Sequence, residues 1–80
     1  ESPLAAKLVW LLADGPLGKA ALAQALGHAS VSGELNKQVT RLLAQMLIEM
    51  TLPDKPNSRL QKYRLTERGQ AMLTEQQRNP

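Results

Sequence analysis

Cysteine is absent from this 80-residue sequence, and His28 is its single histidine. A disulfide framework and a thiolate metal site are therefore excluded, and one histidine without further ligands does not make a zinc site. The sequence also lacks any apolar run near the roughly 18–20 residues that a membrane-spanning helix needs. Missing cysteines suit a reducing compartment. We therefore expect a cytoplasmic protein with no metal, no cofactor and no membrane partner.

Residue patterns for catalysis are missing as well. No two acidic residues have the spacing of a general acid–base pair, and His28 has no recognisable nucleophile beside it. The stretch from Gly15 to Ala20 looks like a phosphate loop, but the Walker pattern requires glycine at position 13 and Ser or Thr at position 20, and alanine stands at both. We predict that this stretch is a turn, that the chain is not an enzyme, and that it has no catalytic residue.

Phenylalanine is absent too, so the core must be built from aliphatic side chains with Trp10 and Tyr63 as the only Trp or Tyr. Hydrophobic residues make up 42% of the chain, which is typical of a folded protein, and the length suits one small domain. We place this domain at residues 1–74 and a polar tail at residues 75–80. Because the sequence starts at Glu1 without methionine and ends on polar residues, we expect it to be a fragment of a larger protein.

Three segments in the first half of the chain have helical signals. Ser2 and Pro3 suit the N-cap and first turn of a helix that ends before Asp14-Gly15-Pro16. After one extended residue at Leu17, a short helix over residues 19–26 ends at Gly27. A third helix runs from about Ser32 to Met46, with an apolar stripe formed by Leu35, Val39, Leu42, Leu43 and Met46.

The period of the pattern changes after residue 47. Residues 48–52 and 60–65 alternate between apolar and polar and are predicted strands, and the stretch between them, rich in proline, is a loop. Thr66 caps a last helix, in which Gly69 indicates close packing and Met72 and Leu73 are anchors. This order predicts a mostly helical α+β fold, a winged helix-turn-helix with three helices, a two-stranded wing hairpin and a C-terminal helix. We expect the following side chains to be mainly buried: Leu8, Leu11, Leu22, Leu26, Leu35, Val39, Leu42, Leu43, Ile48, Met50, Tyr63 and Leu65.

Positive charge is concentrated on the predicted hairpin. The net charge is +3, and five of the ten Lys and Arg residues lie between Lys55 and Arg68, against Glu67 as the one acid. Two interpretations remain open. The hairpin straddles a phosphate backbone, which attracts such charges, or it is an exposed sheet edge that its charges and prolines protect from aggregation.

The third predicted helix has a polar face opposite its apolar stripe. Lys37 and Arg41 stand one turn apart on this face, Gln38 has a side chain of the type that reads bases, and Ser32 lies at the helix N-terminus, where a phosphate can bind. Glu34 opposes a phosphate contact there. The candidate DNA-binding residues are therefore Ser32, Lys37, Gln38, Arg41, Lys55, Arg59, Lys62 and Arg64.

A protein-interaction module with the same fold is the alternative function. Trp10 cannot share the face of the first helix that carries Leu4 and Leu8, so part of this apolar helix remains for a partner. Such a module would dimerise the parent protein or dock on its upstream domains.

The wing is distinctive in sequence. Pro53-Asp54-Lys55-Pro56 followed by Ser58-Arg59-Leu60-Gln61-Lys62-Tyr63-Arg64-Leu65, together with residues 27–35, resembles the C-terminal winged-helix domain of bacterial AlbA-type transcriptional regulators. Those proteins are also labelled RecG-related ATP-dependent DNA helicases or divergent AAA proteins, and a very similar tail occurs on some Fic-domain proteins.

The resemblance covers roughly residues 17–70 and implies a winged-helix fold and a DNA-binding role in transcription regulation. The implied partners are duplex DNA, the upstream domains of the parent protein and a second copy of the chain. It implies neither ATP binding nor helicase activity for these residues. The nucleotide-handling region of such a parent, and the adenylylating motif of a Fic-type parent, would lie outside this sequence.

Overall fold

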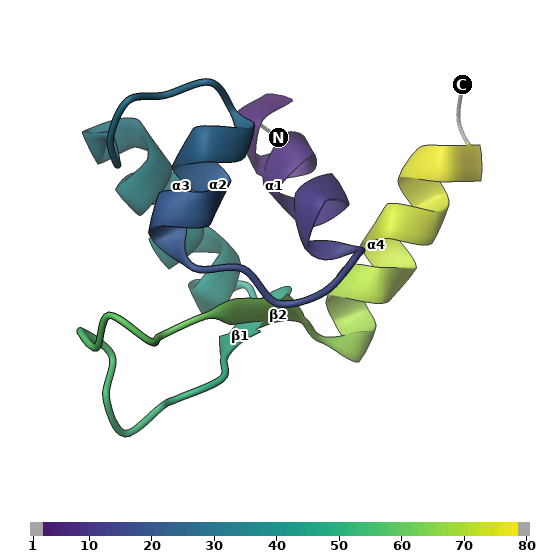
Figure 1. Cartoon of the computed structure of the whole chain (residues 1–80). Helices are drawn as coiled ribbons and strands as arrows, with labels where there is room; N and C mark the ends of the chain where they lie inside the picture. Colours follow the sequence, from purple (N-terminus) through teal and green to yellow (C-terminus); the bar gives the residue numbers. More distant parts are fainter. Residues whose placement is uncertain (1–2, 79–80) are drawn as a thin grey trace.

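The computed structural model describes residues 3–78 and contains four helices and a two-stranded antiparallel sheet. The elements, in chain order, are α1 (Pro3–Leu12), α2 (Lys19–Ala25), α3 (Gly33–Ala44), β1 (Ile48–Met50), β2 (Tyr63–Leu65) and α4 (Glu67–Arg78) (Figure 1). This is the predicted order of a winged helix, so the mostly helical α+β fold class is confirmed. The predicted N-cap at Ser2 lies outside the described residues.

The start of α3 combines an N-cap with a strong apolar stripe. The Ser32 hydroxyl accepts a hydrogen bond from the Leu35 backbone N–H at 3.0 Å, which satisfies a donor that the first turn leaves free. Leu35, Val39 and Leu42 lie on one face and are almost fully buried. The stripe therefore fixes the orientation of α3 against the rest of the domain.

The end of α3 falls at Ala44, two residues before the predicted end at Met46. Met46 has a φ of 60°, a left-handed conformation that closes the helix. The Met46 N–H bonds to the Leu43 carbonyl at 3.0 Å, and the Leu47 N–H bonds to the Leu42 carbonyl at 3.0 Å, the pattern of a Schellman motif. The turn directs the chain straight into β1.

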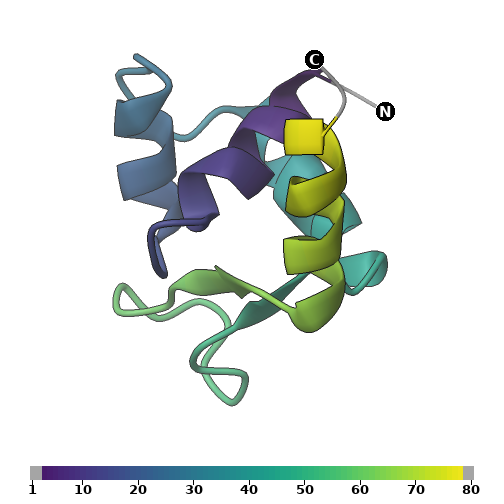
Figure 2. The same cartoon turned by 90° about the vertical axis from the view of Figure 1, so that its right-hand side faces the viewer.

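α1 is the central element, because it packs against α2, α3, α4 and β2. In both views the sheet lies beneath α1, α2 and α3 (Figures 1 and 2). Burial is confirmed for seven of the predicted core side chains, namely Leu8, Leu22, Leu35, Val39, Leu42, Ile48 and Tyr63. The other five are only half-buried at the edge of this core: Leu11, Leu26, Leu43, Met50 and Leu65.

The wing, residues 48–65, contains shorter strands than the sequence predicts. The paired residues are Ile48 with Leu65, Glu49 with Arg64 and Met50 with Tyr63, and the expected alternation holds, with Tyr63 inward and Arg64 outward. Leu17 adds the predicted extended residue, since it exchanges two backbone hydrogen bonds with Tyr63, at 3.0 and 2.8 Å. This isolated bridge ties the wing to the segment before α2.

α4 closes the far side of the domain, opposite the wing (Figure 1). Thr66 caps it as predicted, because its hydroxyl accepts from the Gly69 N–H at 3.0 Å. A Cβ at Gly69 would overlap the Leu47 carbonyl oxygen, so the predicted close packing is confirmed. Leu73 is buried, and the helix continues to Arg78, so residues 75–78 of the expected tail are helical. The domain boundary at residue 74 stays a prediction.

Candidate nucleic-acid interface

The exposed face of α3 carries two of the candidate cations. Lys37 and Arg41 stand one turn apart and are exposed, while the apolar stripe faces the core. Neither side chain forms an ion pair within the described residues, so both charges are available to a partner. Ser32 is half-buried at the N-cap, where its oxygen is occupied by the Leu35 N–H.

Gln38 does not fit its predicted role as a base-reading residue. Its side chain is only 3% exposed, and its amide nitrogen donates to the Glu34 carboxylate at 2.7 Å. Gln38 stands three residues after Leu35 and four before Leu42, which is the spacing of one helix face. The sequence spacing alone therefore puts Gln38 beside the apolar stripe. Gln38 therefore leaves the candidate interface.

The wing carries the other candidate cations, and all four are exposed: Lys55, Arg59, Lys62 and Arg64. Of these four residues, only Arg64 forms an ion pair within the described residues: its Nε donates to the Glu49 carboxylate at 2.7 Å across the sheet. Both side chains of this pair are about half exposed, so solvent screens it, and its contribution to stability is small. Its main effect is to offset one of the positive charges of the wing.

The side chain of Gln61 stabilises the loop of the wing through hydrogen bonds to the backbone. This role was not predicted from the sequence. Its side chain accepts from the Leu52 N–H at 2.9 Å and donates to the carbonyls of Leu52 and Lys55 at 2.5 and 3.0 Å. Because the amide occupies the backbone groups of Leu52, the strands end early. Gln61 is 6% exposed. Its position in the sequence indicates this burial, because Gln61 stands two residues before the inward-facing Tyr63 and such residues lie on the same side of a strand.

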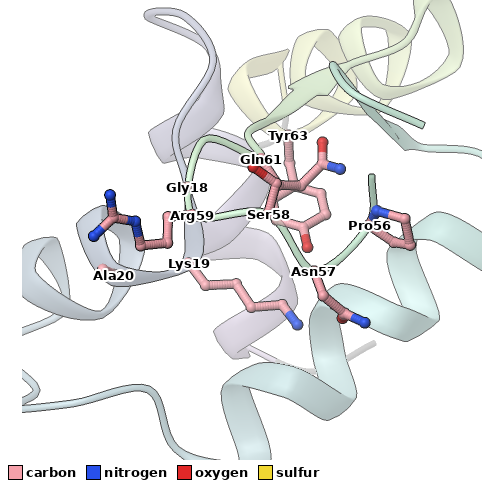
Figure 3. A pocket seen from close by; sticks show the side chains of 9 residues that line it. All are labelled: Gly18, Lys19, Ala20, Pro56, Asn57, Ser58, Arg59, Gln61 and Tyr63. Atoms are coloured by element: carbon pink, nitrogen blue, oxygen red, sulfur yellow. The ribbon is translucent and has the colours of Figure 1, made fainter. Parts of the chain in front are cut away.

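A pocket of about 480 Å³ lies between the start of α2 and the wing (Figure 3). Lys19 from α2 and Arg59 from the wing both line it, which brings a cation missed in the sequence next to a predicted one. The Gly15–Ala20 stretch is no phosphate loop, since Leu17 pairs with β2 and Gly18 is the N-cap residue of α2. This geometry agrees with the turn that the sequence predicts here.

Tyr63 forms the floor of this pocket. The residue is 4% exposed, and burial raises the pKa of its hydroxyl above the ordinary value of 10.0. The hydroxyl is therefore a neutral donor at physiological pH. Among the described residues there is no cluster of three or more His, Cys, Asp or Glu that suits a metal ion. None of the described helices has the length and apolarity to cross a membrane.

Comparison with solved structures relates this fold to two groups of proteins. A Fic family protein from Desulfovibrio desulfuricans is 33% identical with a TM-score of 0.73, over 84% of this chain and 21% of that one. The adhesin competence repressor AdcR from Streptococcus pyogenes is 22% identical with a TM-score of 0.78, over 96% of this chain and 55% of that one. A variant of ZitR from Lactococcus lactis is 21% identical with a TM-score of 0.78, over 96% of this chain and 51% of that one.

The chain thus spans about half the length of AdcR and ZitR and about a fifth of the Fic family protein. At these identities AdcR and ZitR support the winged-helix fold alone. No curated protein matches the sequence significantly. The matches agree with the Fic part of the resemblance and give no support to the RecG-related helicase label.

Sequence comparison against protein families gives the more specific result. The family described as "Filamentation induced by cAMP protein Fic-like, C-terminal domain" matches residues 4–66. This range runs from the first turn of α1 to the cap of α4 and so includes α2, α3 and the whole wing. The chain belongs to the Fic-like C-terminal domain family.

Proposed function

We propose that this domain binds duplex DNA, with α3 in the major groove and the wing on the phosphate backbone. The observation that carries the proposal is the placement of the exposed cations. The start of α3 and the wing project from the same side of the domain, opposite α4 (Figure 1), and each carries exposed Lys and Arg side chains. Phosphate neutralisation by such charges supplies most non-specific DNA affinity.

The charges that serve this contact are Lys37 and Arg41 on α3 with Lys55, Arg59 and Lys62 on the wing. None of them has an ion-pair partner within the described residues. Arg64 is partly offset by Glu49, and Ser32 is available only through its hydroxyl proton. The net charge of +3 is modest, so we expect weak binding by the single domain and a gain from avidity when two copies act together.

A titration with duplex DNA at several salt concentrations tests this function. Each lysine that neutralises a phosphate contributes about 0.9 to the slope of log K against log salt. Lys37→Ala and Lys62→Ala remove one charge from each element, so each variant reduces the slope by about 0.9, and the double variant reduces it by about 2. Lys7→Ala is the matched control, because Lys7 is an exposed lysine on α1.

Two outcomes of this titration would contradict the proposed DNA interface. If Lys7→Ala lowers the affinity as much as Lys37→Ala and Lys62→Ala do, the attraction is diffuse and the interface is not on α3 and the wing. Absence of salt-dependent binding at low ionic strength refutes DNA binding altogether.

The ion pair between Glu49 and Arg64 provides a second test, in which DNA affinity is expected to rise. Glu49→Gln releases Arg64 from its partner and removes a negative charge near the DNA. We therefore expect Glu49→Gln to bind duplex DNA more tightly and with a steeper salt slope than the unchanged chain. Glu75→Gln, on α4 at the opposite side, makes the same charge change and is expected to leave both quantities nearly unchanged.

The family match supports a second part of the proposal, which concerns a larger parent protein. We propose that the parent is a Fic-type protein whose upstream part carries any catalytic activity, and that this domain directs it to DNA or regulates transcription. In this arrangement the domain itself is not an enzyme and holds no cofactor.

An interaction with another protein surface is the second candidate function, and Trp10 favours it. The Trp10 side chain is 62% exposed, and it borders a groove of about 300 Å³ with Lys7, Leu11, Ala25 and Leu26. Exposed aromatic side chains of this kind often anchor protein interfaces. Under this function Trp10→Ala weakens association with the upstream domains or with a second copy, measured by sedimentation, and leaves DNA affinity unchanged.

A further inference from the structure

We propose that the pocket between α2 and the wing is a binding site for one phosphate group. Its lining contributes two cations, Lys19 and Arg59, and contains no carboxylate among the described residues. The remaining side-chain donors are those of Asn57, Ser58, Tyr63 and Gln61, and the Gln61 amide is already bonded to the carbonyls of Leu52 and Lys55. A concave site with several donors and no acidic side chain favours an anion with several acceptor oxygens.

The hydroxyl of Tyr63, which lines the pocket, gives a second argument for a ligand. The residue as a whole is 4% exposed, so its ring is held in the core, and its hydroxyl makes no hydrogen bond within the described part of the chain. Among the described residues, the one fully buried side-chain polar atom without a partner is Oε1 of Gln38, so the Tyr63 hydroxyl is within reach of a ligand in the pocket. In Figure 3 this hydroxyl points into the opening of the pocket, toward Asn57. An anion in the pocket would accept the hydrogen bond that Tyr63 has free to donate.

The positions of the other donors agree with this ligand. Figure 3 shows the Lys19 ammonium and the Asn57 amide extending into the same opening, while the Arg59 guanidinium lies on the other side, next to Ala20. Lys19, Asn57 and Tyr63 therefore form the inner donor set, and Arg59 adds positive charge at the rim. The pocket volume of about 480 Å³ falls in the range of small-molecule sites. It has room for a phosphate together with an attached sugar and base.

Two sources supply such a phosphate, a phosphodiester of a nucleic-acid backbone or a monoester of a free small molecule. Three probes separate them in titrations of the 80-residue chain followed by amide NMR: thymidine monophosphate, the phosphodiester dinucleotide of thymidine, and thymidine without phosphate. We expect saturable shifts at Lys19 and residues 57–59 with one of the phosphate probes and none with thymidine. Preference for the monoester assigns a free ligand, and preference for the diester assigns the backbone.

Variants of the donors test the geometry. Lys19→Gln removes a charged donor and is expected to weaken binding of the preferred probe about tenfold. Tyr63→Phe keeps the buried ring and removes only the hydroxyl, so a threefold to tenfold loss, on the order of one hydrogen bond, is expected. Lys7→Gln is the matched control, because Lys7 is an exposed lysine on α1 outside this pocket, and its variant is expected to bind the probe normally.

Failure of this proposal is distinct from failure of the DNA-binding function. Lys62→Ala is expected to weaken duplex binding and to leave the small probes unaffected, since Lys62 does not line the pocket. Probe binding that persists in both Lys19→Gln and Tyr63→Phe, equal binding of thymidine, or shifts that never saturate would overturn the phosphate site. A chain that binds a phosphate probe but no duplex would keep the site and refute the DNA function.

Discussion

α3 and the wing both carry exposed cations, but different forces hold the two elements in place. The cations of α3 stand on a helix whose opposite face is fixed by Leu35, Val39 and Leu42, all nearly fully buried. The loop of the wing is fixed by the side-chain amide of Gln61 and by a series of tight backbone turns. Apolar packing is lost only when the domain unfolds, whereas a few hydrogen bonds can open locally. We therefore expect α3 to be the rigid half of the candidate interface and the wing to be its adaptable half.

The largest expected effect breaks the rigid half. Leu42→Ala removes a side chain that is 1% exposed and leaves a cavity between α3 and the core. We expect the free energy of unfolding to fall by about 2–5 kcal/mol, much of the total for a domain of this size. Leu60→Ala is the matched control on the wing, because Leu60 is 75% exposed, and it should change stability by less than about 0.5 kcal/mol. Chemical denaturation measures both, and equal losses would contradict the comparison.

A smaller effect loosens the adaptable half. Gln61→Ala leaves the Leu52 N–H and two carbonyls without their side-chain partner, so we expect a loss of about 1–3 kcal/mol. Amide hydrogen exchange should accelerate at Leu52 and Lys55 well before it accelerates at Leu42. In the unchanged chain, too, residues 55–59 should exchange faster than α3.

The control for this variant is Gln24→Ala on α2, where the glutamine side chain is exposed and makes no hydrogen bond in the described part of the chain. It should leave exchange in the wing unchanged. If Gln61→Ala accelerates exchange equally in α3 and the wing, the two halves open as one unit and the contrast between them is wrong.

The junction of the two halves offers a change in the stabilising direction. Met46 has φ 60° at the position where α2 uses Gly27, with φ 81°, in the same Schellman pattern. A non-glycine residue in this conformation costs roughly 1 kcal/mol, part of which the greater freedom of unfolded glycine cancels. Met46→Gly should therefore stabilise the domain by up to about 0.5–1 kcal/mol. Gly27→Ala should destabilise it by a similar amount, and thermal unfolding of the pair provides the test.

The smallest effect concerns the point where the wing is anchored to the core. Burial raises the pKa of Tyr63 in the folded state above its unfolded value of 10.0. The stability that depends on the neutral hydroxyl is therefore fully present below pH 10 and is lost as the pH rises through the folded pKa. Denaturation between pH 9 and 11 should show a decline that is smaller in Tyr63→Phe. An identical decline in the variant would assign the loss to other groups.

Four features could be predicted from the sequence: the order of the elements, the apolar stripe of α3, the inward and outward sides of the wing, and the close approach at Gly69. These features follow from local periods, about 3.6 residues for a helix and 2 for a strand, and from the restricted conformations of capping and turn residues. Three features depend on the tertiary structure: Lys19 and Arg59 line one pocket, Gln61 bonds back to Leu52, and Glu49 offsets Arg64. Each of these contacts joins residues far apart in the chain, and their distance depends on how α2, the strands and the wing pack together, which no local period encodes.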